Sequence, residues 1–206
     1  MDADAVEIRV LGCLIEKQRT TPETYPLSLN ALRLACNQST NRDPVVDYDE
    51  HTIREGLNRL SRRGWARLAS GPGSRAVKFR HLFDEALGLT SEQTAVLAVL
   101  MLRGPQTPGE LKQRTQRLHT FDGLDEIARA LEELIEGDLA RRLDRRPGQK
   151  EERYEHLLSE DDAEAARSPA EPEPGPQPDR LAQLEREVAD LRREIAQLRD
   201  ELRGPG

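Results

Sequence analysis

An internal repeat constrains the fold of this chain more than any other feature of its sequence. Residues 11–22 return, with similar residue types, as residues 97–108. Further on, Ile53, Leu57, Leu60 and Ala66 return as Ile127, Leu131, Leu134 and Ala140, and Gly73, Phe79, His81 and Leu82 return as Gly148, Tyr154, His156 and Leu157. Three blocks recurring in the same order indicate that one structural unit is duplicated. Between the first two blocks, the first copy carries about 12 extra residues.

Each copy reads as three helices followed by a β-hairpin. In the second copy, capping boxes at Thr90 and Thr107 open helices that end near Leu102 and Leu118, and a third helix covers residues 124–136. Strands over residues 139–143 and 152–157 flank a turn. The first copy has a third helix over residues 49–64, which Asp49 can cap, and strands over residues 65–70 and 75–81. Three helices closed by a hairpin are the winged variant of the helix-turn-helix.

The predicted fold is therefore mainly α with small β wings. It comprises two tandem winged-helix (helix-turn-helix) domains, over residues 1–85 and 86–160, and a C-terminal coiled-coil helix. Residues 161–179 are acidic and rich in proline, and such a linker is expected to be disordered.

Residues 180–203 carry a heptad pattern. The apolar positions alternate steps of three and four residues: Leu181, Leu184, Val188, Leu191, Ile195, Leu198 and Leu202. β-branched residues at central a positions with leucine at d favour a parallel two-stranded coil, so the pattern predicts a homodimer. An amphipathic helix docked on its own domain is the alternative.

Several segments carry a resemblance to a known family. The run Tyr25-Pro-Leu-Ser-Leu-Asn-Ala-Leu and the block Asn37-Gln with Asn41-Arg-Asp-Pro resemble the YceH-like family of uncharacterised bacterial proteins, and Gly104-Pro-Gln-Thr-Pro-Gly-Glu-Leu is similar to it as well. The resemblance covers residues 6–159 and implies tandem winged-helix domains. It implies no catalytic or ligand residues, because none are assigned to that family.

Charge is divided unevenly along the chain, whose net charge is −7. Residues 1–85 carry a balance of +1, residues 86–160 of −3 and the remainder of −5. A nucleic-acid binder usually has a basic domain, so only the first domain fits that role.

The candidate DNA contacts follow from this division. They are Arg54, Asn58, Arg62 and Arg63 around the third helix of the first domain, Arg75, Lys78 and Arg80 in its hairpin, and Arg145, Arg146 and Lys150 in the second hairpin. Arginine and asparagine on a recognition helix can read guanine and adenine edges, and the hairpins suit phosphates. The plainer interpretation is a helix kept soluble by its arginines.

The extra loop of the first copy holds Asn37, Gln38, Asn41, Arg42, Asp43 and Pro44. Side-chain to backbone hydrogen bonds can make such a block a self-supporting turn. Alternatively, Asn41 and Arg42 belong to a binding surface.

The leading functional hypothesis is a dimeric DNA-binding protein, possibly a transcriptional regulator. The alternative is a tandem winged-helix adaptor that binds proteins, as accessory factors in chromosome organisation do. No catalytic motif, metal-ligand spacing or cofactor signature is found, so neither an enzyme nor a metal or cofactor is expected. Without a signal peptide or a membrane span, the chain is expected to be cytoplasmic.

Overall fold

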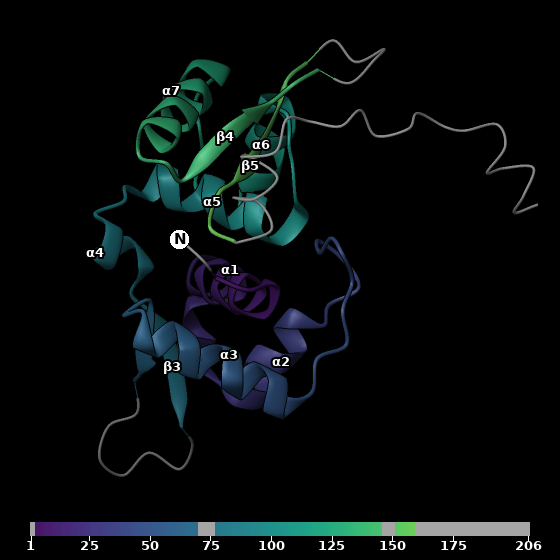
Figure 1. Cartoon of the computed structure of the whole chain (residues 1–206), viewed down its shortest axis with the longest axis vertical. Coiled ribbons are helices and arrows are strands. Elements are labelled where there is room, and N and C mark those ends of the chain that lie inside the picture. The colour runs from purple at the N-terminus through teal and green to yellow at the C-terminus, as the bar shows by residue number, and fades with distance from the viewer. Residues whose placement is uncertain (1–2, 70–76, 146–150, 160–206) are drawn as a thin grey trace, which may run out of the picture. The chain divides into compact units, whose positions relative to one another are not determined.

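Two sets of three helices with paired strands make up the described part of the chain. The structure is a computed structural model, and it describes residues 3–69, 77–145 and 151–159. The first set contains α1 (Ala5–Thr20), α2 (Leu29–Cys36) and α3 (Glu50–Arg62), with strands β1 (Leu27–Ser28), β2 (Ala66–Leu68) and β3 (Lys78–His81). The strands form an antiparallel sheet in the order β1-β3-β2 (Figure 1). A 3-10 turn, η1 (Pro22–Thr24), joins α1 to β1.

The second set repeats this order. It contains α5 (Ser91–Arg103), α6 (Pro108–Thr115) and α7 (Leu124–Glu136), then the antiparallel strands β4 (Ala140–Leu143) and β5 (Arg153–His156). Gln106 forms two backbone hydrogen bonds with Tyr154, of 2.9 and 2.8 Å, where β1 pairs with β3 in the first set. The predicted order of three helices and a hairpin is confirmed in both sets.

Helix starts agree with the capping signals in the sequence. Thr90 and Thr107 each form a capping box, with Gln93 and Glu110, and the Asp49 carboxylate accepts a hydrogen bond from Thr52 N. These side chains satisfy backbone N–H groups that have no partner within the helix. The predicted starts of these helices are therefore confirmed.

Two helical features differ from the prediction. Helix α6 ends at Thr115 and not near Leu118, because Leu118 N turns back to bond Thr115 O at 2.6 Å and the next residues form a turn. The helix α4 (Phe83–Leu87) was not predicted. It is short, its N-cap provides no side-chain hydrogen bond, and Gly88 ends it with φ of 67°.

Helices α1 and α5 lie side by side at the centre of the molecule (Figure 1). Residues 94–102 of α5 are all buried, because α1 covers one side of that helix and α6 and α7 cover others. A Cβ atom at Gly12 would lie 2.9 Å from Leu102 Cγ, so glycine permits the close approach of α1 to α5. Residues from both sets therefore form one hydrophobic core.

His81 and His156 are buried at equivalent strand ends, opposite Ala66 and Ala140. His81 Nε2 lies 2.7 Å from Gln18 Oε1, and its backbone N–H donates to the Tyr25 hydroxyl. Burial lowers the pKa of His81 to about 4, and Asp84, 3.4 Å from Nδ1, only partly opposes that shift. The histidine is therefore neutral in the folded protein at neutral pH.

Several predictions fall outside the described residues. They concern Arg75, Arg146 and Lys150, the linker over residues 161–179, and the heptad positions of residues 180–203. Within the described part of the chain, no helix has the length and apolar character needed to cross a lipid bilayer.

Candidate nucleic-acid interface

Helix α3 divides into a buried and an exposed face, as its periodicity predicts. Ile53, Gly56, Leu57 and Leu60 are buried, and a Cβ atom at Gly56 would lie 2.9 Å from Val6 Cγ1 on α1. Arg54, Asn58 and Arg62 are exposed. Their spacing of four residues places them along one side of the helix. The structure thus brings three of the predicted contacts onto one solvent-facing stripe.

The arginines near α3 fall into two groups. Arg59 contacts Asp4 at 2.7 Å and Glu7 at 3.4 Å, and Arg63 Nε donates to Glu7 at 2.8 Å. The Arg63 guanidinium also lies over the Trp65 ring, 5.5 Å from its centroid. These contacts fasten the end of α3 to the start of α1. Arg63, which the sequence suggested as a DNA contact, is therefore held by a structural ion pair.

Arg54 and Arg62 form the other group. Neither has a carboxylate within ion-pair distance among the residues that the structure describes. Asn58 donates to Glu55 at 3.2 Å. Among the described residues, the exposed stripe of α3 therefore presents two guanidinium groups that form no ion pair, although Glu50 is exposed on the same side of the helix.

The sheet of the first set adds a second basic surface. Arg67 on β2 lies opposite Arg80 on β3, and Lys78 shares the Arg80 face because side chains alternate along a strand. Arg80 contacts Glu85 at 2.6 Å. Arg67 is exposed and was missed in the sequence, although its alternation with Ala66 and Leu68 could have indicated it.

In the second set, the equivalent helix is acidic. The repeat aligns Arg54, Asn58 and Arg62 with Ala128, Glu132 and Glu136, all of which are exposed on α7. In its hairpin, Arg141 pairs with Glu155, and Arg142 and Arg145 each lie 3.4 Å from Glu152. Arg141, Arg142 and Arg145 are thus paired with acids inside the same hairpin, while Arg153 contacts Glu110 on α6 at 4.0 Å.

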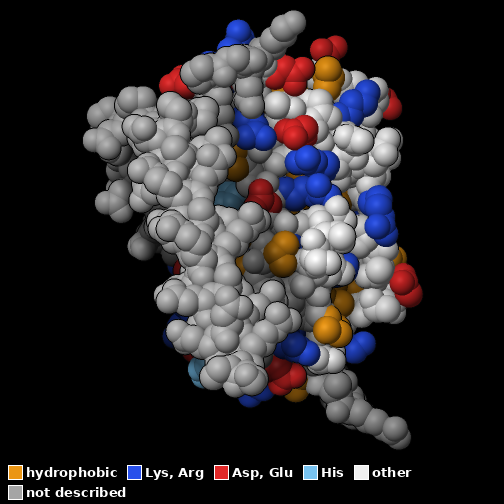
Figure 2. Space-filling view, turned by 90° about the vertical axis from the view of Figure 1, so that its right-hand side faces the viewer, with side chains coloured by type: hydrophobic (Ala, Val, Ile, Leu, Met, Phe, Trp, Pro, Cys, Tyr) orange, Lys and Arg blue, Asp and Glu red, His pale blue; other side chains and the backbone are white. Residues whose placement is uncertain are grey.

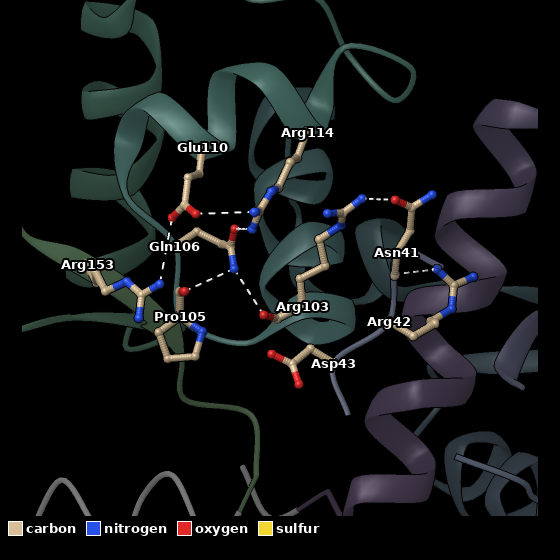
Figure 3. A pocket seen from close by; sticks show the side chains of 9 residues that line it. All are labelled: Asn41, Arg42, Asp43, Arg103, Pro105, Gln106, Glu110, Arg114 and Arg153. Carbon is tan, nitrogen blue, oxygen red and sulfur yellow. Dashed lines mark hydrogen bonds and ion pairs between the residues drawn. The ribbon is translucent and has the colours of Figure 1, made fainter. Parts of the chain in front are cut away.

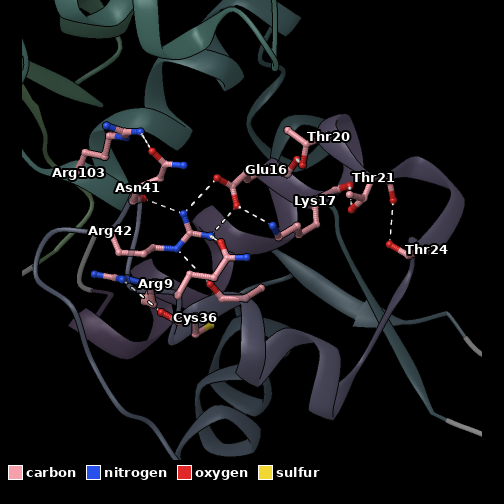
Figure 4. Close-up of polar contacts among 12 residues, drawn as sticks. Arg9, Glu16, Lys17, Thr20, Thr21, Thr24, Cys36, Asn41, Arg42 and Arg103 are labelled. Carbon is pink, nitrogen blue, oxygen red and sulfur yellow. Dashed lines mark hydrogen bonds and ion pairs between the residues drawn. The ribbon is translucent and has the colours of Figure 1, made fainter.

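The Asn-Gln and Asn-Arg-Asp-Pro block is a hydrogen-bonded turn around the buried Arg42 (Figure 4). Asn41, Asp43 and Pro44 are exposed. The Arg42 side chain is fully buried and donates to Ala35 O at 3.1 Å, to Gln38 Oε1 at 2.9 Å and to the Glu16 carboxylate at 2.5 Å. Asn37 bonds the backbone of Tyr48 through both ends of its amide. The prediction of a self-supporting turn is confirmed. The alternative that Arg42 belongs to a binding surface is wrong, because its guanidinium does not reach solvent.

No group of three His, Cys, Asp or Glu side chains in the described ranges is arranged to hold a metal ion. Cys13 and Cys36 are buried and free.

Comparison with known proteins gives a family. Residues 3–149 match the family described as "Protein of unknown function, DUF480". The chain is 50% identical over 188 residues to a UPF0502 protein of Opitutus terrae, covering 89% of this chain and 80% of that protein. It is 52% identical over 163 residues to a UPF0502 protein of Pseudomonas aeruginosa, covering 79% and 73%. These matches agree with the resemblance to the YceH-like proteins.

Proposed function

The chain belongs to this family, whose description assigns no activity, and we propose from its surface that it binds double-stranded DNA. The proposed contacts are the exposed stripe of α3 and the basic face of the β2–β3 sheet. In this proposal the protein binds DNA and does not catalyse a reaction. It acts in the cytoplasm, and regulation of transcription is the role that such binding suits.

We further propose that each set of helices is a winged-helix domain. The first set runs helix, strand, helix, helix and hairpin, with the sheet order β1-β3-β2. The second set has the same order, with the Gln106 bridge in place of the first strand. In helix-turn-helix proteins the recognition helix enters the major groove, and α3 is the corresponding helix here.

The observation that carries the proposal is the contrast between α3 and α7. Both helices bury the same repeated residues, yet α3 exposes Arg54, Asn58 and Arg62 where α7 exposes Ala128, Glu132 and Glu136. A need for solubility alone is met by either charge, so it does not explain why α3 exposes arginine and asparagine where the equivalent positions of α7 are alanine and glutamate. Arginine pairs with guanine and asparagine with adenine in the major groove.

The sheet has a different part in this proposal. Arg67, Lys78 and Arg80 lie on a flat strand surface, and basic side chains of that kind contact phosphates without reading sequence. Glu85 competes for Arg80, so this arginine contributes less than Arg67.

Fluorescence anisotropy with a labelled random duplex, at about 50 and 200 mM salt, tests the proposal. We expect affinity that falls steeply with salt, and a loss of about one unit of log–log slope for Arg67→Ala. Arg129→Ala is the matched control, because Arg129 is an exposed arginine on α7. No binding tighter than about 100 μM at the lower salt would refute the proposal.

A second candidate function is that of a protein-binding adaptor. Its support is the acidic face of α7, where Glu132, Glu133 and Glu136 accompany the exposed side chains of Leu124 and Ile135. Such a surface repels phosphates and suits a basic, partly apolar protein partner. An adaptor would show no salt-dependent affinity for DNA in the same titration.

A further inference from the structure

A polar pocket lies where the loop after α2 meets the C-terminal end of α5 and helix α6 (Figure 3). Its volume is about 520 Å³, and a second cavity of about 460 Å³ adjoins it. Asn41, Arg103 and Arg114 line both cavities. We refer to the first cavity, with Asn41, Asp43, Arg103, Gln106, Arg114 and Arg153 on its walls, as the junction pocket.

Positive charge exceeds negative charge in the junction pocket. Three arginines present their charge to it, Arg103, Arg114 and Arg153, against the two acids Asp43 and Glu110, which leaves an excess of one positive charge in a chain whose net charge is −7. Figure 2 views this side of the molecule and shows basic side chains gathered on it. Arg42 is the one lining arginine that is fully neutralised, through its buried bond to Glu16.

Glu110 cannot neutralise both Arg114 and Arg153. Its carboxylate contacts Arg114 at 3.2 Å and Arg153 at 4.0 Å, and it also accepts a hydrogen bond from Thr107 N at 2.9 Å as part of the capping box. One carboxylate is therefore shared between two guanidinium groups and a helix cap. Arg114 also donates to the amide oxygen of Gln106, which is a neutral partner.

Arg103 stands out among these residues. It ends α5, is partly buried, and donates to the neutral side chain of Asn41. Among the described residues no carboxylate lies within ion-pair distance of it. Burial and the nearby charges of Arg114 and Arg42 lower the pKa of Arg103. An anion placed here would relieve the repulsion among these arginines.

We propose that the junction pocket binds a small molecule that carries a phosphate group, held by Arg103, Arg114 and Arg153. A phosphate monoester carries about −1.5 to −2 charges at neutral pH, and its three oxygens suit guanidinium groups from three directions. A carboxylate has two oxygens, so it suits three guanidinium groups less well. Asp43, Asn41 and Gln106 offer acceptors and donors for hydroxyl groups of the remaining part of the ligand.

The site takes residues from both sets of helices. Asn41 and Asp43 come from the loop after α2, and the three arginines come from α5, α6 and β5. A ligand that contacts both sides stabilises the folded chain by mass action, so binding is visible as a rise in melting temperature.

The test is a thermal-shift and calorimetric titration of the full chain with ribose 5-phosphate, inorganic phosphate and acetate, at constant ionic strength. We expect ribose 5-phosphate to raise the melting temperature and acetate to leave it unchanged. Arg103→Gln should lower the affinity about 10–100-fold, because it removes a charged hydrogen bond while leaving no acid unpaired. Arg129→Gln should leave the affinity unchanged, since Arg129 lies on α7 away from the pocket lining.

Equal binding of ribose 5-phosphate and inorganic phosphate, still lost in Arg103→Gln, supports a phosphate site that does not recognise the organic part. Two results would overturn the proposal. One is the absence of any shift with either phosphate at about 10 mM, a concentration that saturates a site of millimolar affinity. The other is undiminished binding by an Arg103→Gln protein whose circular dichroism spectrum shows it to be folded. In the first case, a loss of DNA affinity in Arg103→Gln would assign these arginines to the DNA surface.

Discussion

The buried guanidinium of Arg42 provides the sharpest prediction about stability. The change is Arg42→Ala, which deletes a side chain that bonds Ala35 O, Gln38 and Glu16 and has no exposed surface. The deletion leaves the Glu16 carboxylate, 15% exposed, without its strongest partner, and leaves a buried carbonyl of α2 without its donor. The first loss acts on the contact between the loop and α1, and the second on the contact between the loop and α2.

The magnitude follows from the degree of burial. Breaking a buried ion pair by removing one partner costs about 3–5 kcal/mol. The lower end applies here, because Glu16 keeps Lys17 at 3.5 Å and is itself partly exposed. A loss of about 3 kcal/mol corresponds to a melting temperature lower by roughly 6–12 °C for a chain of this size.

Guanidinium denaturation followed by circular dichroism measures this effect. Arg54→Ala is the matched control, because Arg54 is exposed and is expected to change stability by less than about 0.5 kcal/mol. Glu16→Gln should destabilise the fold as well, and the double variant Arg42→Ala with Glu16→Gln should cost less than the sum of the two. Stability of Arg42→Ala within about 1 kcal/mol of Arg54→Ala would refute the interpretation of a turn held by the buried Arg42.

Three further predictions concern other parts of the molecule. Because burial lowers the pKa of His81 to about 4 from 6.5, the unfolded chain takes up a proton that the folded chain does not. Stability should therefore fall by up to about 3 kcal/mol as the pH falls from 6.5 to 4, and denaturation of His81→Gln should show a smaller fall. Glu132→Ala should leave DNA affinity in the anisotropy assay unchanged or slightly raised, since it removes repulsion; a loss would contradict the assignment of DNA binding to α3. Chelator and reductant should leave the melting temperature unmoved, and a large drop with chelator would reveal a missed ligand set.

The parts of the fold that the sequence predicted are those with a local signal. The faces of α3 follow from the spacing of Ile53, Leu57 and Leu60, and the starts of α5 and α6 follow from capping boxes that lie within four residues. Helix α4 has no such signal, because it lasts little more than a turn and lacks a side-chain cap.

The contacts of individual arginines were less predictable, because the acids that pair with them are distant in the sequence. An arginine is usually exposed, and nothing near Arg42 in the chain indicates that Glu16, on another helix, holds it in the core. The ion pair that engages Arg63 likewise depends on Glu7, far away on α1. The junction pocket joins a loop of the first set to helices of the second, so only the packing of α1 on α5 brings its residues together.

The two sets have kept a common interior and diverged on their surfaces, and this bears on how the chain could recognise DNA. Under the proposed function, one chain offers a single recognition helix, since α7 exposes acids where α3 exposes arginines. A single small module buries about 600–1,000 Å² on DNA, so a second, linked copy would add contact area and avidity for a paired site. The heptad pattern of residues 180–203 predicts that copy, as a parallel dimer.

The variant Ile195→Asp in the full chain separates DNA binding by α3 from dimerisation through residues 180–203. It places a charge at an a position of the heptad pattern and leaves α3 unchanged. Sedimentation should show the parent protein as a dimer and Ile195→Asp as a monomer. Affinity for a duplex with two half-sites should then fall about 100-fold or more, while affinity for one half-site should stay the same. Equal loss on both duplexes would mean that the tail itself contacts DNA. A parent protein that is monomeric at high micromolar concentration would refute the dimer and leave the proposal for α3 standing.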